Sequence, residues 1–304
     1  IERLQAPTNI KITSEENGTL AHDQVANAES YQAFIDLSEQ ALDENAWNNM
    51  YQFIETDGTT LHMIAVANYW NDNHTLYYMT SQASPTQQFI RLAVPEFPEG
   101  VFADSNLMVW NAPSNINTSE YTPTYRVYSA IDTQIGGGDV NGTRFDISYL
   151  EGGKSYTFLV KAIGNRTKYL DSEYSVAITV YKLAKPEFTI QNGQYVWQGV
   201  ANASSYYMEI DGVMVTADFH VSGSTYAYTP RFTQAGDHQV TLQAIGDARN
   251  NLDSAVFTFT QRAEILTAPE IEFEYSAETV VSGGKIIVTV TEQSPNCAGY
   301  QYEI

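Results

Sequence analysis

The histidines and the single cysteine are the side chains of this chain best suited to nucleophilic or metal-dependent catalysis. There are five histidines, His22, His62, His74, His220 and His238, and one cysteine, Cys297. No Gly-x-Ser-x-Gly or His-Glu-x-x-His motif accompanies them, and no complete phosphate-binding P-loop is present. One cysteine can form neither an intrachain disulfide nor a Cys-built zinc site. We therefore predict that the chain is not an enzyme and has no catalytic residue.

Calcium is the one cofactor candidate that the residue types suggest. Asp139, Asn141 and Thr143 offer oxygen ligands at alternate positions around Gly142, and hard cations prefer oxygen ligands. The twelve-residue calcium loop with its terminal glutamate is absent. Asn-Gly is also a strong hairpin signal, so an ordinary turn explains the same residues. Both interpretations stay open, and no other cofactor is predicted.

The segment 68–78 is the best candidate for binding a partner. It carries Trp70, Asn71, Asp72, His74 and Tyr77. Exposed aromatic side chains on a hairpin can stack on a sugar or anchor in a protein pocket, so the partner would be a protein or a glycan. The alternative is that Trp70 and Tyr77 form a cross-strand pair that stabilises the hairpin.

The composition limits the class of protein. The chain has 304 residues, 36 acidic and 15 basic, with a formal charge of −21. Such a charge repels phosphate backbones, which argues against nucleic acid as a partner. No apolar run reaches the length of a membrane span, and 43% hydrophobic residues suffice for ordinary cores. The length allows two to four domains.

Internal repeats indicate how these residues are positioned. Four similar segments end in proline: Leu4–Pro7, Leu92–Pro95, Leu183–Pro186 and Leu266–Pro269. Each is followed by strand-like runs, and later by alternating apolar residues that end in Ala65, Ala162 or Ala244. The sequence therefore predicts repeats at 1–91, 92–182 and 183–265, and an incomplete fourth repeat with its first three strands at 266–304. Because about three strands cannot close a sandwich, we expect the native chain to continue beyond Ile304.

The repeats share aromatic positions that we expect to form their cores. These are Trp110 and Trp197 in the second strand, Tyr125 and Tyr206 in the third, and Tyr156 in the sixth. His22 replaces the tryptophan in repeat one, and His238 replaces Tyr156 in repeat three.

Repeat two resembles a fibronectin type III domain. The resemblance rests on Trp110, on the segments 125–128 and 150–162, and on the last-strand start at 172–175. It implies an all-β fold of tandem, seven-stranded immunoglobulin-like sandwiches. It also implies a tyrosine corner built from Leu150 and Tyr156, in which the phenol bonds to the preceding turn.

A helical insertion is predicted in repeat one. Asp36-Leu37-Ser38-Glu39 reads as a capping box, and apolar residues then recur at helical spacing. We predict a helix over 37–54 in place of the middle strands. It either covers the edge of the sheet or binds a partner through Trp47.

Together these patterns predict a non-enzymatic array of sandwich modules, with an extracellular location. The expected role is a spacer, a stalk or an adhesive segment of a cell-surface or secreted protein, since the repeats are similar to those of bacterial surface proteins. Two alternatives are a structural subunit of a virion or filament, which would self-associate, and the accessory modules of a polysaccharide-degrading enzyme.

Overall fold

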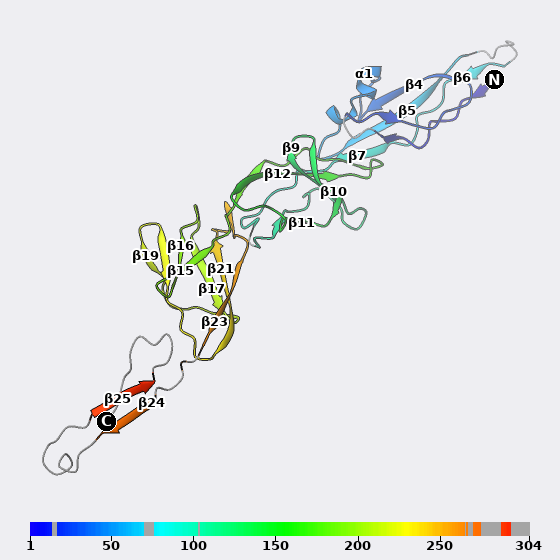
Figure 1. Cartoon of the computed structure of the whole chain (residues 1–304). Coiled ribbons are helices and arrows are strands. Elements are labelled where there is room, and N and C mark those ends of the chain that lie inside the picture. Colours follow the sequence, from blue (N-terminus) through cyan, green and yellow to red (C-terminus); the bar gives the residue numbers. More distant parts are fainter. Residues whose placement is uncertain are drawn as a thin grey trace. The chain divides into compact units, whose positions relative to one another are not determined.

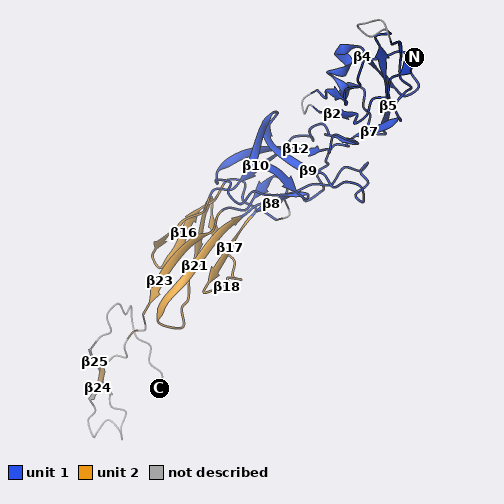
Figure 2. Ribbon diagram, turned by 90° about the vertical axis from the view of Figure 1, so that its right-hand side faces the viewer, with its two compact units in different colours: residues 1–184, 201–204, 245–254 blue, residues 185–200, 205–244, 255–304 orange. Residues whose placement is uncertain are grey.

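The computed structural model describes residues 1–13, 17–69, 76–102, 104–264, 266, 270–274 and 287–292. The chain is almost entirely β, with 47% of residues in strands and 3% in helices (Figure 1). It divides into two compact units (Figure 2). Unit 1 contains residues 1–184, 201–204 and 245–254, and unit 2 contains residues 185–200, 205–244 and 255–304.

Repeat one is built around a sheet of β4, β5 and β7. Its strands are β1 (Glu2–Arg3), β2 (Lys11–Ile12), β3 (Leu20–Ala21), β4 (Ala28–Ile35), β5 (Thr59–Ala67), β6 (Tyr78–Met79) and β7 (Gln87–Arg91). Along β5 every second residue is buried, from Thr59 to Ala67, because alternate side chains point to opposite faces of a strand. β5 pairs antiparallel with both β4 and β7, and β2 pairs with β3.

The predicted helix over 37–54 is wrong in its extent. The structure has one turn of α-helix, α1 (Glu44–Trp47), and a 3₁₀ turn, η1 (Met50–Gln52). The N-cap is Asp43, whose Oδ1 accepts a hydrogen bond from Ala46 N at 2.7 Å. Asp36 instead bonds through Oδ1 to Thr60 N at 2.8 Å, and Leu37 is 98% exposed. The expected capping box therefore does not form.

Repeat two has one long sheet and one short sheet. Its strands are β8 (Leu107–Val109), β9 (Thr124–Ala130), β10 (Thr133–Asn141), β11 (Arg144–Asp146), β12 (Lys154–Ile163), β13 (Tyr169–Leu170) and β14 (Ile178–Lys182). The long sheet has the order β10-β9-β12-β14-β22, where β22 is Asn251–Leu252 of unit 1, and the short sheet pairs β11 with β8.

Repeat three contains two four-stranded sheets. Besides β22, its strands are β15 (Phe188–Gln191), β16 (Gln194–Gln198), β17 (Ser205–Ile210), β18 (Val213–Met214), β19 (His220–Ser222), β20 (Thr225–Tyr228), β21 (Gly236–Ile245) and β23 (Phe257–Ala263). The sheets have the orders β15-β16-β20-β19 and β18-β17-β21-β23. Beyond them, β24 (Glu270–Glu274) pairs antiparallel with β25 (Ile287–Glu292). The third strand expected near Ile304 lies outside the described residues.

The predicted core aromatics lie in or against the hydrophobic clusters of repeats two and three. Trp110, Trp197 and Tyr125 are only 2–3% exposed, and Tyr156 and Tyr206 are half-buried against the same clusters. The Trp110 ring meets Tyr125 edge-on at 5.3 Å, and Trp197 meets Tyr206 at 5.6 Å. The shared aromatic position therefore has the same packing role in both repeats.

The turn before the sixth strand is held by a side-chain hydrogen bond in both repeats two and three, but the side chain differs. In repeat two, Tyr156 OH donates to Glu151 O at 3.1 Å, as the resemblance implied. In repeat three, His238 Nε2 donates to Gln234 O at 3.0 Å, while its Nδ1 lies 2.6 Å from Asp211 Oδ2. Both ring nitrogens face acceptors, so this site favours the protonated imidazole.

We expect repeat three to lose stability as the pH rises through the raised pKa that His238 has in the folded chain. The hydrogen bond to Asp211 raises the pKa of His238 above its ordinary 6.5, and the same bond lowers the pKa of Asp211 below 3.8. The raised pKa stabilises the fold below pH 6.5 and ceases to do so as the pH passes the folded-state value. The lowered pKa of Asp211 stabilises the fold above pH 3.8. The stabilisation from the pair is therefore largest between pH 3.8 and pH 6.5.

Urea titrations followed by the Trp197 indole NMR signal should show the loss of stability at higher pH. His238→Tyr should remove this pH dependence while keeping the hydrogen bond at the corner. A pH profile unchanged by His238→Tyr would contradict this assignment.

Candidate functional site at the junctions between repeats

The same backbone arrangement occurs three times in unit 1: within repeat one, between repeats one and two, and between the end of repeat two and the loop of residues 245–254. We call the residues that precede each Leu-to-Pro linker, together with its leucine, the junction strands: Glu2–Leu4, Ile90–Leu92 and Tyr181–Leu183. The loops that connect the last two long strands of each repeat are the junction loops: residues 68–81, 163–172 and 245–254. All of these strands and loops belong to unit 1.

Two serines bind the chain to its own sheet at the end of each of the first two junction loops, one at the last loop residue and one three residues later. Ser172 Oγ accepts a hydrogen bond from Ala162 N, and Ser175 Oγ accepts one from Val160 N, both at 2.9 Å. Ser81 Oγ accepts from Ala65 N at 2.8 Å, and Ser84 Oγ accepts from Met63 N at 3.0 Å, in the same way. The loop therefore leaves and rejoins its sheet at fixed points.

Within the loop of repeat two, side-chain oxygens organise the backbone. Asn165 Oδ1 accepts hydrogen bonds from the amides of Thr167, Lys168 and Tyr169 at 3.0–3.1 Å. Asp171 Oδ1 accepts one from Gly164 N at 2.8 Å. Such side-chain bonds to nearby amides hold a loop in one conformation.

The loop of residues 245–254 repeats this arrangement. Asp247 Oδ1 accepts from the amides of Arg249, Asn250 and Asn251 at 2.8–3.0 Å, and Asp253 Oδ1 accepts from Gly246 N at 2.8 Å. Burial alone would raise the pKa of Asp247, but these donors lower it to about 2.

Each junction loop pairs in parallel with a junction strand. β13 pairs with β7, β22 with β14 and β6 with β1. The first amide of each junction strand donates to the loop: Glu2 N to Tyr77 O at 2.9 Å, Ile90 N to Lys168 O at 2.8 Å and Tyr181 N to Asn250 O at 2.8 Å. The leucine amides of Leu4, Leu92 and Leu183 donate at 3.0–3.1 Å. The three ladders share one register.

A leucine from each of the last two loops also enters a neighbouring core. Leu170 is fully buried in the hydrophobic cluster of repeat one, although it belongs to repeat two. Leu252 is fully buried in the cluster of repeat two. Each of these two cores is therefore completed by a side chain that comes from later in the sequence.

A cation follows the first residue of every junction strand. Arg3 Nη1 donates to Thr80 O at 2.9 Å, and Arg91 forms an ion pair with Glu173. Arg91 also lies over the Tyr51 ring, 5.5 Å from its centre. Lys182 is 5% exposed; burial lowers its pKa and the Asp253 carboxylate opposes that change.

Asn115 joins repeats one and two directly. Its Oδ1 accepts from Ala93 N at 2.8 Å, and its Nδ2 donates to Arg91 O at 2.8 Å and to Thr56 O at 2.7 Å. One amide side chain thus connects the linker to both repeats.

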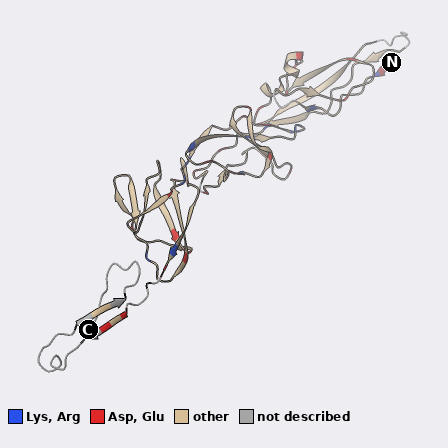
Figure 3. Cartoon of the chain, in the orientation of Figure 1, with Lys and Arg blue, Asp and Glu red and all other residues tan. Residues whose placement is uncertain are grey.

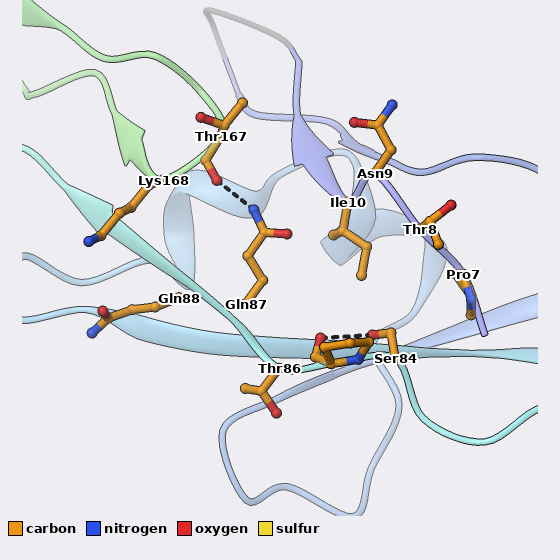
Figure 4. Close-up of a pocket in the computed structure, with 11 residues that line it drawn as sticks. Pro7, Thr8, Asn9, Ile10, Ser84, Thr86, Gln87, Gln88, Thr167 and Lys168 are labelled. Atoms are coloured by element: carbon orange, nitrogen blue, oxygen red, sulfur yellow. Dashed lines mark hydrogen bonds between the residues drawn. The ribbon is translucent and has the colours of Figure 1, made fainter. Parts of the chain in front are cut away.

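A pocket of about 560 Å³ lies beside the junction loop of repeat two (Figure 4). It is lined by Pro7–Ile10, by Ser84–Gln88, and by Thr167 and Lys168. Gln87 Nε2 donates to Thr167 O at 2.5 Å along its wall. Most of the lining residues have polar side chains and none is aromatic, so we assign no ligand to this pocket.

Four of the predicted binding residues, Trp70, Asn71, Asp72 and His74, lie outside the described residues, so this site stays a prediction. Tyr77 lies 5.7 Å from the ring of Tyr69, and its carbonyl accepts the bond from Glu2. Trp47 is half-buried against the core of repeat one and meets His22 edge-on at 5.9 Å.

Among the calcium candidates, the side chain of Asp139 is paired with a protein group, since its Oδ1 lies 2.5 Å from Arg126 Nε. Asn141 and Thr143 take part through their backbones: Asn141 pairs with Thr124 in the sheet, and Thr143 O accepts from Trp110 N. Among the described residues no group of three or more His, Cys, Asp or Glu could hold a metal ion.

The junctions themselves could not be predicted from the repeats taken one at a time. Their signal is the shared run Ala-Ile-Gly-Asn/Asp followed by Leu-Asp-Ser, at 162–172 and 244–254. Within the described part of the chain, no helix is long and apolar enough to cross a membrane.

No protein-family model and no curated protein matches the chain. The chicken CNTN1 FN1–FN3 domains are 13% identical, with 86% of this chain and 100% of that one covered and a TM-score of 0.26. The chicken interferon gamma receptor alpha chain is 15% identical, with coverages of 52% and 92% and a TM-score of 0.22. The central fibronectin-III array of RIM-binding protein is 15% identical, with coverages of 85% and 98% and a TM-score of 0.20.

Because these TM-scores lie below 0.5, the fold assignment rests on the chain's own strand order. In repeat three, two four-stranded antiparallel sheets enclose a tryptophan on the second strand and a tyrosine on the third. Repeat two has the same aromatic pair and a tyrosine corner. The chain is thus an array of tandem fibronectin type III-like β-sandwiches.

Proposed function

We propose that this chain is a non-enzymatic spacer in a cell-surface or secreted protein, in which repeats one and two are held together at their junction. The single observation that carries the proposal is the ladder between the junction strand of repeat one and the junction loop of repeat two. A spacer must resist bending between modules, and a short linker alone does not prevent rotation.

Several contacts oppose bending between repeats one and two. The β7–β13 ladder fixes the backbone, Leu170 fills the core of repeat one, and Asn115 bonds to both sides of the linker. These contacts differ in kind, so no single rotation of the linker preserves them all. We infer that the two repeats move as one body.

The extracellular setting is supported by the sequence. The repeats are similar to those of bacterial surface proteins, and the charge of −21 keeps a row of modules from sticking to one another. The role as a spacer requires no catalytic group, in agreement with the absence of catalytic motifs from the sequence.

Distances between spin labels test the spacer directly. Labels on Glu39→Cys in repeat one and Ser148→Cys in repeat two, in a Cys297→Ser chain, should give one narrow distance distribution. Asn115→Asp should broaden it, because the change removes two donors and sets a carboxylate against two carbonyls, at a cost of about 2–4 kcal/mol.

Asn192→Asp is the control for the added charge. Asn192 is exposed in the turn between β15 and β16 of repeat three, so the change adds the same carboxylate away from the junction of repeats one and two. A broad distribution in the parent chain would overturn the proposal. If the distance distribution of Asn115→Asp were as narrow as that of the control, Asn115 would not be needed to hold the two repeats together.

A further inference from the structure

The ladder of β1 and β6 holds an apolar side chain at the position from which the two later loops enter a neighbouring core. In each of the three ladders an apolar loop residue stands opposite the cation of the junction strand. The pairs are Met79 with Arg3, Leu170 with Arg91 and Leu252 with Lys182. Leu170 and Leu252 are fully buried, whereas Met79 is 38% exposed. One position in the ladder is therefore apolar in all three cases and buried in two.

The direction in which Met79 points follows from its neighbour. Tyr78 is buried in a hydrophobic cluster of repeat one, and Tyr169 is buried in the same way in the core of repeat two. Successive side chains of a strand point to opposite faces, so Met79 points away from its own repeat, as Leu170 does. Met79 belongs to neither hydrophobic cluster of repeat one.

The strand opposite Met79 is also more exposed than its counterparts. Glu2 and Arg3 are both exposed, so this edge carries one charge of each sign (Figure 3). At the next junction Arg91 is partly covered, because it lies over the Tyr51 ring. Lys182 is 5% exposed. The cation of the junction strand is thus covered at both ladders in which the loop leucine is buried.

We propose that Met79 is the docking point for a further fibronectin type III-like sandwich, whose last strand runs into β1. The occupant follows from continuity with the two later junctions. There, the junction strand is the end of β7 or β14, the last strand of the repeat that receives the leucine. Glu2–Leu4 forms the same ladder in the same register. The sandwich that receives Met79 is therefore the one whose last strand ends in Glu2–Leu4.

A second copy of this chain fits the surface less well. β1 already occupies the place of the junction strand beside β6, so a separate chain would bring no strand to the ladder. Two copies at −21 each also repel one another. A sandwich that is joined through β1 brings the ladder with it and has only to provide space for Met79.

The space required is the one that Leu170 fills in repeat one, in a cluster with Ile12, Leu61 and Phe89. Leucine and methionine exchange with little change in volume, and the unbranched methionine adapts to an irregular space. Repeat one can therefore serve as the receiving sandwich in a test.

An extended chain tests the proposal. Residues 1–92 are joined to residues 5–304, so that Ile90–Leu92 of the added sandwich replaces Glu2–Leu4. Both chains carry Cys297→Ser. The thiol of Met79→Cys in the following repeat should react with a maleimide about 100-fold more slowly in the extended chain than in the parent, because the added core buries it. Glu39→Cys, at an exposed position outside the ladder, is the control and should react equally fast in both chains.

A second thiol reports on the core of the added sandwich. Ala33 is fully buried in the cluster that Leu170 completes. The thiol of Ala33→Cys in the added sandwich should be protected when the following repeat carries Met79. It should react at least about tenfold faster with Met79→Asp, which sets a carboxylate into that core. Gln82→Asp is the matched control and should not change the rate, because Gln82 is exposed and Glu173 stands at its position in repeat two.

Equal rates for Met79→Cys in the two chains would overturn the proposal. So would an unprotected thiol of Ala33→Cys while Met79 is in place, or one that Met79→Asp leaves protected. Every one of these chains keeps the junction between repeats one and two, so none of these outcomes bears on the test of the spacer.

Discussion

Leu170→Ala is expected to destabilise repeat one by about 2–5 kcal/mol, although Leu170 belongs to repeat two. Leu170 is fully buried and lies in one cluster with Ile12, Leu61 and Phe89 of repeat one. Truncation leaves a cavity that these neighbours cannot fill without moving the junction strand. The loss should therefore appear in a repeat that the mutation does not touch in sequence.

Hydrogen exchange resolved along the chain is the measurement. A loss of about 3 kcal/mol should speed exchange of the protected β5 amides by about 100-fold. Leu252→Ala is the matched control, because Leu252 lies in the cluster of repeat two. It should speed exchange in β12 and leave β5 unchanged. If Leu170→Ala affected only repeat two, the proposed sharing of cores would be wrong.

The sequence revealed the repeats because their strands obey short-range rules. Alternation placed Leu61, Met63 and Ala65 on one face, and all three are fully buried. The sequence shows a serine after the alanine of each repeat, Ser81 after Ala65 and Ser172 after Ala162, although the two spacings differ. The structure explains the recurrence, since each hydroxyl accepts a hydrogen bond from the amide of that alanine.

The helix in repeat one could not be predicted in its true extent. A capping box and apolar spacing are local signals, whereas Asp36 is engaged by Thr60, 24 residues away. That long-range bond holds Asp36 at φ 49°, outside the conformation an N-cap adopts. The helix therefore begins later, where Asp43 is free to cap it.

The pairing of strand and loop at the junctions could not be predicted from the sequence for a related reason. Each repeat read alone suggests a closed sandwich, and no periodic pattern links a loop to a strand about 80 residues before it. The repeated Leu-Asp-Ser run marks the loop, but its partner is known only once Tyr169 and Leu170 are seen to pair with Ile90 and Arg91. A likeness between loops does not identify what they bind.

Gly164→Ala is expected to break the junction between repeats one and two by adding a single methyl group. A Cβ on Gly164 would lie 2.1 Å from the carbonyl oxygen of Tyr169 and 2.7 Å from the carbonyl carbon of Leu170, far inside van der Waals contact. The φ of Gly164 is not in the left-handed region, so the glycine is needed for space. The loop must open, which withdraws Leu170 and breaks the bond from Gly164 N to Asp171. We expect a loss of about 3–5 kcal/mol, at least that of Leu170→Ala.

Gly138→Ala provides the control, since no atom lies within 4 Å of the position that its methyl group would take and its φ is not positive. It should change the unfolding free energy by less than about 1 kcal/mol. In Gly164→Ala, exchange of the Ile90 and Leu92 amides should rise together, because both donate to the loop that the methyl group displaces. Equal stability of the two variants would mean that the loop closes without requiring glycine. If stability fell while the Ile90 and Leu92 amides stayed protected, the fold of the loop could be disturbed without breaking the ladder that joins repeats one and two. Lower stability with both amides exposed, the expected result, makes this glycine a requirement of the junction.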